Sequence, residues 1–147
     1  SFEFGQFRGQ PFAVIPSSQV VGIAQHLRDR EDFRFFTDLT VVDWPNAPAR
    51  FEVVIHLYSP AKNSRIRLKS RVADGDEFPT LSSLFPAANW LEREAFDMFG
   101  VRFAGHPNLK RMLLPDDWDG HPLRKEKSIV AMDNDWVNRH LGIESGQ

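Results

Sequence analysis

The chain has 147 residues, the length of one domain, and its 41% hydrophobic and 26% charged residues are ordinary values for a soluble globular protein. A formal net charge of −2 argues against non-specific nucleic-acid binding, which needs an excess of Lys and Arg. Cysteine is absent, which excludes disulfides, thiolate zinc sites, a cysteine nucleophile and cysteine-ligated iron–sulfur clusters. No apolar run approaches the roughly 20 residues of a membrane span and no secretory leader is evident, so we expect a soluble, cytoplasmic protein.

The first elements predicted are a short strand and a helix. Pro11–Ile15 is an apolar run closed by Pro16, which indicates a brief strand. From Ser18 to about Arg30, apolar residues recur at i, i+3, i+4 and i+7, which predicts an amphipathic helix. These apolar positions are Val20, Ile23, Ala24 and Leu27.

Three strands are predicted next. Phe35–Asp43 is rich in β-branched and aromatic residues, and the two prolines after it require a loop. Phe51–Tyr58 alternates and has one strongly apolar face, and Arg65–Val72 alternates again. Asp74-Gly75 marks a turn, and residues 80–85 predict a single helical turn that stops at Pro86.

The third of these strands has a basic face. It is formed by Arg65, Arg67, Lys69 and Arg71. Three interpretations stay open: a solvated face, a surface that docks on an acidic partner, or a nucleic-acid site. The strand lacks the interleaved aromatic residues of a base-stacking platform, which disfavours the last.

The predicted fold class is α+β, a small mixed sheet covered by helices, with an extended C-terminal arm. We expect an α+β core domain at 1–104 and a docking arm at 105–147. The arm alternates prolines, charges and isolated large apolar residues, a poor composition for a core of its own. It is expected to lie on neighbouring subunits and to end in a short helix, Asn134–Leu141, stopped by Gly142. The alternative is that the arm folds back over its own sheet.

Residues 87–100 predict a second helix. Asn89 is a preferred N-cap, Glu92 stands at the N3 position, and Gly100 suits the left-handed C′ position. Glu92 lies within the apolar arc of the helix, whereas Arg93, Glu94 and Asp97 lie on the opposite arc. Either a capping box or a buried ion pair with an unidentified Arg explains Glu92.

The charged residues of this helix and two histidines after it allow a functional and a structural interpretation. Glu94 and Asp97 share a helix face, but no His follows at the spacing of a di-iron motif. Ion pairs within the chain, such as Arg93–Asp97, or across a subunit contact are therefore favoured over chemistry. His106 and His121 stand in matching Gly-His-Pro triplets. Two imidazoles do not make a zinc site, so we expect each Gly to supply a bend and each ring to bond nearby backbone.

These residues carry a family resemblance. Glu92-Arg93-Glu94, Asp97, His106 and the run Lys110-Arg111-Met112-Leu113 follow one another at spacings that resemble the signature of the C-subunit family of respiratory NADH:quinone oxidoreductase, or complex I. The similarity extends from about Ser17 to Lys125, and Glu126-Lys127-Ser128 departs from the family pattern. The resemblance implies interface or structural roles for Glu92, Arg93, Glu94, Asp97, His106, Lys110, Arg111, Trp118, His121 and Arg124.

The resemblance also implies a function. Members of the family are accessory subunits of a proton-translocating peripheral arm that passes electrons from NADH to quinone. We expect no catalytic residue, metal or cofactor in this chain, with FMN and iron–sulfur clusters held by partner subunits. The expected partners are the large quinone-cavity subunit and the small terminal-cluster subunit, with no nucleic acid.

The resemblance places the protein at the cytoplasmic face of the bacterial inner membrane, attached only through the complex. The equivalent subunit of a ferredoxin-dependent or hydrogenase-type membrane complex is the alternative within the lineage. From other classes, a metal hydrolase that uses His106, His121 and Asp117 and a nucleic-acid module on the basic face stay as alternatives.

Overall fold

A five-stranded mixed sheet is the centre of the chain in the computed structural model, which describes residues 2–126 and residue 139. Its order is β1-β2-β5-β4-β3, with β2 and β5 parallel and the other neighbours antiparallel. The strands are β1 (Glu3–Phe7), β2 (Gln10–Val14), β3 (Phe35–Asp43), β4 (Phe51–Ser59) and β5 (Ser64–Val72).

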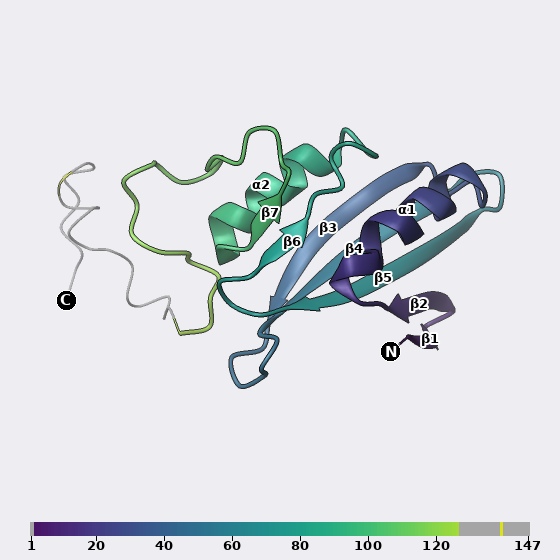
Figure 1. Cartoon of the computed structure of the whole chain (residues 1–147), viewed down its shortest axis with the longest axis horizontal. Helices are drawn as coiled ribbons and strands as arrows, with labels where there is room; N and C mark the ends of the chain where they lie inside the picture. Colours follow the sequence, from purple (N-terminus) through teal and green to yellow (C-terminus); the bar gives the residue numbers. More distant parts are fainter. Residues whose placement is uncertain (1, 127–138, 140–147) are drawn as a thin grey trace.

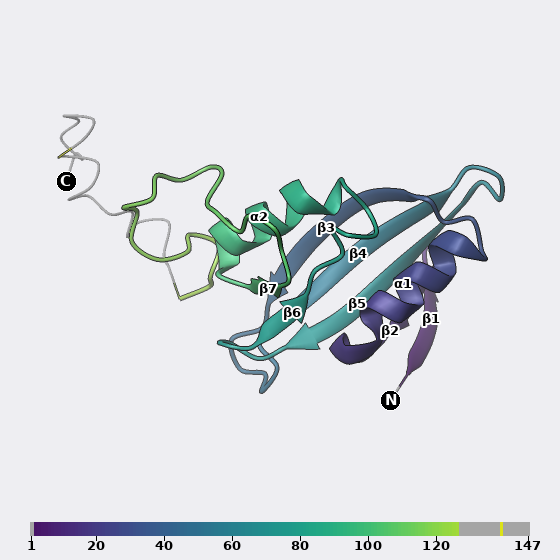
Figure 2. The same cartoon turned by 45° about the horizontal axis from the view of Figure 1, so that its top comes forward.

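Both α-helices cover one face of this sheet (Figures 1 and 2). A 3-10 turn, η1 (Ser17–Gln19), leads into α1 (Val20–Asp29), and α2 (Ala88–Phe99) packs beside β3. Strand β4, between β5 and β3, turns alternate apolar side chains to the helices, because successive side chains of a strand point to opposite faces. These side chains are Phe51, Val53, Ile55 and Leu57, each no more than 1% exposed.

A second, two-stranded sheet fixes the start of α2 relative to the main sheet. Its parallel strands are β6 (Glu77–Pro79) and β7 (Arg102–Ala104), and the rings of Phe78 and Phe103 pack edge to face at 5.9 Å. The amide of Thr80 then donates to the carbonyl of Ala104 at 3.0 Å. This bond holds Thr80 and Leu81 beside α2.

The strongly periodic elements confirm their predictions. The α+β class and the mixed sheet are confirmed, and β3 has the predicted bounds. The predicted strands Pro11–Ile15, Phe51–Tyr58 and Arg65–Val72 each agree with the structure within one residue, whereas helix Ser18–Arg30 begins later, as α1. The structure adds strands that the sequence did not predict: β1, β6 and β7 are short and carry no clear alternation.

The face of the sheet away from the helices is the basic one. Glu52 and Val54 of β4 point to this side, yet both are buried, because long neighbouring side chains cover them. Lys69 and Arg71 of β5 lie 3.3 and 2.9 Å from the Glu52 carboxylate. The predicted apolar face of β4 is confirmed, and its second face is covered in part by basic side chains of β5.

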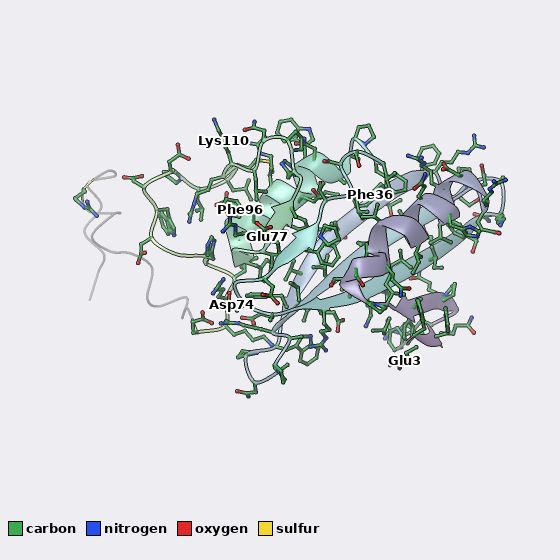
Figure 3. All side chains as sticks on the ribbon, in the orientation of Figure 1. Glu3, Phe36, Asp74, Glu77, Phe96 and Lys110 are labelled. Atoms are coloured by element: carbon green, nitrogen blue, oxygen red, sulfur yellow. The ribbon has the colours of Figure 1, made fainter. Side chains whose placement is uncertain are left out.

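Residues 105–126, which we call the arm, form no helix or strand. They run along α2 and end near the turn after β5, where Figure 3 labels Asp74. The division into a core domain, 1–104, and a docking arm, 105–147, stays a prediction. The predicted helix Asn134–Leu141, apart from Arg139, lies outside the described residues.

The core position of Leu57 gives a first prediction. Leu57→Ala is expected to lower the free energy of unfolding by about 2–5 kcal/mol, because a fully buried side chain leaves a cavity. Urea unfolding of the purified chain measures this. Phe4→Ala is the control, since Phe4 is 77% exposed and its loss is expected to change stability by less than about 1 kcal/mol. Equal losses in the two variants would contradict this assignment of the core.

Candidate functional site

Asp97 of α2 binds the arm through three successive backbone amides. Its side chain is fully buried, and its Oδ2 accepts hydrogen bonds from N–H groups that converge on it as in an anion-binding nest. The donors are Met112 at 3.0 Å, Leu113 at 2.7 Å and Leu114 at 3.0 Å. Asp97 is therefore buried although it lies opposite the apolar arc of the helix, and its intrachain ion pair is with Arg111 and not with Arg93.

Two further side chains surround Asp97. The guanidinium of Arg111 lies 3.6 Å from Asp97 Oδ1 and donates to the carbonyl of Gly120 at 2.8 Å, which closes a loop of the arm. His121 Nδ1 lies 2.9 Å from the backbone carbonyl of Asp97, so this nitrogen carries the proton. Burial is the largest influence on His121 and lowers the pKa of its ring, which favours the neutral form.

Gly100 ends α2 at a position that requires glycine. Its φ of 77° lies in the left-handed region, as predicted for a C′ glycine. A Cβ at this position would lie 2.5 Å from His121 Cδ2 and 2.8 Å from Arg124 Nη2. Gly100 therefore allows both the turn and the close approach of the arm.

Arg93 fixes the other side of the arm. Its guanidinium donates to the carbonyls of Lys110 at 3.1 Å and Arg111 at 3.3 Å. It also lies over the ring of Trp90, 5.0 Å from the centroid. Arg93 thus satisfies backbone acceptors of an irregular segment, and its ring partner Trp90 remains 61% exposed.

Glu92 is a buried carboxyl with a different set of partners. It is fully buried and accepts hydrogen bonds from the Thr80 hydroxyl at 2.5 Å and the Leu81 amide at 2.6 Å. The helix begins at Ala88 and has no side-chain cap, so neither the Asn89 capping box nor a buried pair with Arg is present at Glu92. Burial raises the pKa of the Glu92 carboxyl to about 7, although its two hydrogen bonds act in the opposite direction.

His106 lies next to Glu92. The Asn108 amide donates to His106 Nδ1 at 3.0 Å, so Nε2 carries the proton and donates to the Asn89 carbonyl at 3.1 Å. The same nitrogen is 3.9 Å from Glu92 Oε2. The predicted backbone bonding of both histidine rings is confirmed, and Gly105 and Gly120 have positive φ values of 80° and 73°, as their bends require.

The end of the arm is held by charged pairs. Arg124 donates to the carbonyl of Phe99 at 2.7 Å and makes two bonds of 2.9 Å with Asp74. The Lys125 amide donates to Asp43 at 2.8 Å, and Arg50 forms a double hydrogen bond with the same carboxylate at 2.7 and 2.8 Å. The hydrogen bond from Arg50 is the largest influence on Asp43 and lowers the pKa of that carboxyl.

The remaining predicted residues lie at the edges of this cluster. Glu94 is exposed and lines a small cleft between α2 and β3 that also includes Leu123. Lys110 is exposed and Trp118 is half-buried on the arm. Sequence reasoning missed Thr80, Asp74 and the nest at residues 112–114. Of these, only Asp74 had a recognisable sequence signal, because Asp74-Gly75 predicts a turn. The backbone amides of the nest could not be predicted, because every residue except proline has an amide and the side chains do not show which amides will bind a carboxylate.

This geometry defines a small α+β protein whose buried polar groups attach an irregular arm to a helix. Among the described residues, no group of three His, Asp or Glu side chains is placed to hold a metal ion, and no helix is long and apolar enough to cross a membrane. The family model for the respiratory-chain NADH dehydrogenase 30 Kd subunit matches residues 13–132. The chain belongs to this family.

Relatives and one solved structure agree with the family. The NADH-quinone oxidoreductase C-subunit of Rhodopseudomonas palustris (strain TIE-1) is 42% identical over 125 residues, which are 84% of this chain and 61% of that protein. The corresponding protein of Roseiflexus sp. (strain RS-1) is 46% identical over 86% of this chain and 74% of its own length. A chain of the membrane-bound sulfane sulfur reductase, an archaeal respiratory membrane complex, aligns with a TM-score of 0.79 at 25% identity and covers 97% of this chain and 84% of its own.

Glu92 predicts a pH-dependent stability. The native pKa of about 7 exceeds the ordinary 4.5, so the native state keeps a proton that the unfolded chain releases between these values. The contribution of Glu92 to stability is therefore highest below pH 4.5 and falls as pH rises through 7, by roughly 3 kcal/mol in total. Glu92→Gln is expected to remove this decrease, as measured by urea unfolding from pH 4.5 to 8. Glu94→Gln, on the exposed face of the same helix, should keep it. An unchanged slope in Glu92→Gln would contradict the assignment.

The hydrogen bonds of Asp97 are predicted to hold the arm on α2. Asp97→Asn is expected to lower the free energy of unfolding by about 1–3 kcal/mol, because neutral acceptors bind amides less strongly than a carboxylate does. Hydrogen exchange read by mass spectrometry should show faster exchange at residues 112–114 in this variant. The control is Asp76→Asn in the exposed turn after β5. Unchanged protection of residues 112–114 would show that the nest does not hold the arm.

Proposed function

We propose that this chain is a non-catalytic structural and assembly subunit of a proton-translocating NADH:quinone oxidoreductase. The chain spans 61% of the length of the Rhodopseudomonas relative, so the activity and partners of that whole protein belong to the proposal. The observation that supports it is that two carboxyl groups of the family signature, Glu92 and Asp97, point into the protein. A catalytic carboxylate or imidazole must reach a substrate in a cleft, whereas Glu92 and Asp97 are fully buried and bind the chain's own groups.

The outer surface of the same region has the character of an interface. Three large apolar side chains of α2 and the arm remain exposed: Trp90 at 61%, Leu113 at 60% and Leu123 at 53%. Around Trp90 there is a broad hollow whose other lining residues include Pro86, Arg93 and Pro107. Exposed aromatic and aliphatic residues beside an Arg are typical of the centre of protein–protein interfaces.

The proposed partners are the other subunits of the complex, mainly the large quinone-cavity subunit and the small terminal-cluster subunit. FMN and iron–sulfur clusters are proposed to reside in partner chains, because this chain contains no cysteine to ligate a cluster. Electron transfer and quinone chemistry need fixed geometry, so a rigid neighbour contributes by holding the redox subunits in place. The proposed location is the cytoplasmic face of the bacterial inner membrane, through the complex.

A related complex with another electron partner is the second candidate. The fold match to a chain of the sulfane sulfur reductase favours it, because that protein is also part of a respiratory membrane complex. The two candidates share the structural role of this chain and differ in the neighbouring subunits. The presence of NADH-binding and flavin-binding subunits in the purified complex separates them.

The proposal predicts an assembly defect without a folding defect. Trp90→Ser and Leu113→Ser are each expected to weaken association with the complex by about 1–2 kcal/mol, roughly 5–30-fold, because these side chains are buried only on docking. The measurement is the amount of chain retained on the affinity-purified complex, together with quinone reduction per assembled complex. Stability of the lone chain should stay within about 0.5 kcal/mol of the unaltered chain.

Phe4→Ser is the matched control for this experiment. Phe4 is as exposed as Trp90 but lies on β1, next to Glu3, at the far end of the molecule from Lys110 of the arm (Figure 3). It should leave assembly unchanged. A Trp90→Ser complex that assembles fully but no longer reduces quinone would contradict a purely structural role.

A further inference from the structure

Two cations on the open face of the sheet have no carboxylate partner in the part of the chain that the structure describes. On β5 the stripe of Arg65, Arg67, Lys69 and Arg71 divides into two halves. Lys69 and Arg71 share the Glu52 carboxylate. Among the described residues, Arg65 and Arg67 have no carboxylate within the 4.0 Å of an ion pair.

The environment of Arg67 is unusual for an unpaired guanidinium. Its Nε is buried without a hydrogen-bond partner among the described residues, and its Nη2 has only a long contact of 3.3 Å to Gln10 Oε1. A buried donor that is left unsatisfied is unfavourable, more so for a charged group. His56, the cross-strand partner of Arg67, adds no compensation, because burial and then the charge of Arg67 lower the pKa of its ring.

A hollow lies beside Arg65, and Arg67 contacts one of its lining residues, Gln10. Its volume is about 190 Å³, and it lies between the β1–β2 turn and the β4–β5 turn. The lining residues are Gly9, Gln10, Pro11, Tyr58, Asn63, Ser64 and Arg65. Polar groups of Gln10, Asn63 and Ser64 therefore converge near the unpaired cations, and the space is large enough for one carboxylate side chain.

We propose that Arg65, Arg67 and this hollow form a docking site for a carboxylate-rich segment of a neighbouring subunit, an inference that rests on the proposed structural role of the chain. Two guanidinium groups on one strand face match carboxylates in planar, double hydrogen bonds. Arg65 and Arg67 are two residues apart, which separates them by roughly 6.6 Å along the strand. Two acidic residues one helical turn apart, about 6 Å, or two residues apart in a strand fit this spacing.

The aromatic residues of this face favour a protein segment over a nucleic acid. The rings of Phe12, Tyr58 and Trp44 already stack with cations of β5, at 5.4, 5.2 and 5.1 Å. They are therefore not free platforms on which bases would stack.

Zero-length cross-linking with a carbodiimide tests the proposal in the assembled complex. This reagent joins a lysine amine to a carboxylate at ion-pair distance, and Arg does not react. Arg65→Lys and Arg67→Lys keep the charge and place a reactive amine at the site. The expected product is a covalent link from residue 65 or 67 to an Asp or Glu of another subunit, identified by mass spectrometry.

The chain supplies its own controls for this reaction. Lys69 lies 3.3 Å from Glu52, so an intrachain Lys69–Glu52 link should form in every sample. In Arg71→Lys, a link from residue 71 should compete for the same carboxylate, which can form only one amide bond. If these intrachain links form in the complex but residues 65 and 67 give no link to another subunit, the docking site is wrong while the proposed function stands. Recovery of the unaltered chain without any partner subunit would overturn both.

Charge reversal supplies an independent readout. Arg67→Glu is expected to weaken association with the complex at least 10-fold at low salt, whereas Arg30→Glu at the exposed end of α1 should change it less than 2-fold. Binding of a 20-nucleotide single-stranded DNA by the full chain, abolished in Arg67→Glu, would instead identify a nucleic-acid site and overturn the proposal. Equal retention of the Arg67→Glu and unaltered chains on the complex would also overturn it.

Discussion

The bond between one carboxylate oxygen of Asp97 and three consecutive amides of the arm is the interaction on which the rest of this region depends. Residues 105–126 have no helix or strand in which to satisfy their backbone groups, so each buried amide or carbonyl needs a partner elsewhere. Asp97 supplies the acceptor for three of them, and Arg93 supplies donors for two carbonyls. These polar contacts thereby join a helix and an irregular segment into one body.

The two buried carboxyls of α2 perform different tasks because their surroundings differ. Asp97 is compensated by three amides and a nearby guanidinium, and its bonds reach a segment 15–17 residues away. Glu92 has two neutral donors from the Thr80–Leu81 turn, which do not offset the loss of water, so its pKa rises to about 7. One carboxyl thus fixes the arm, and the other fixes the small β6–β7 sheet to the same helix. Both the arm and the β6–β7 sheet are therefore attached to α2.

The sequence predicts most of the main sheet and little of the contacts of α2. Strands β4 and β5 repeat a two-residue alternation over nine residues each, and β3 is rich in β-branched and aromatic residues, which is enough to predict their bounds within one residue. Strands β6 and β7 have three residues each, too few for any periodicity. The helical wheel does not show that Asp97 is buried, because it describes one helix alone, whereas the arm that covers Asp97 has no periodic pattern. The predicted capping box at Glu92 was wrong for a related reason. The actual partners of Glu92, Thr80 and Leu81, are brought to α2 by the pairing of β6 with β7, which the sequence did not predict.

The same contacts explain why the outer surface of this region suits an assembly role. Glu92 and Asp97 of α2 are turned inward and Asp97 orders the arm, while large apolar side chains such as Trp90 and Leu113 remain on the outside of this ordered scaffold. A preformed surface of this kind loses less conformational entropy on docking than a flexible peptide with the same side chains. In the proposed complex, the buried polar network would contribute to association indirectly, since it keeps the arm in the shape that a partner meets. Substitutions at Asp97 and at Trp90 would weaken assembly by different routes, the first through the order of the arm and the second through the contact itself.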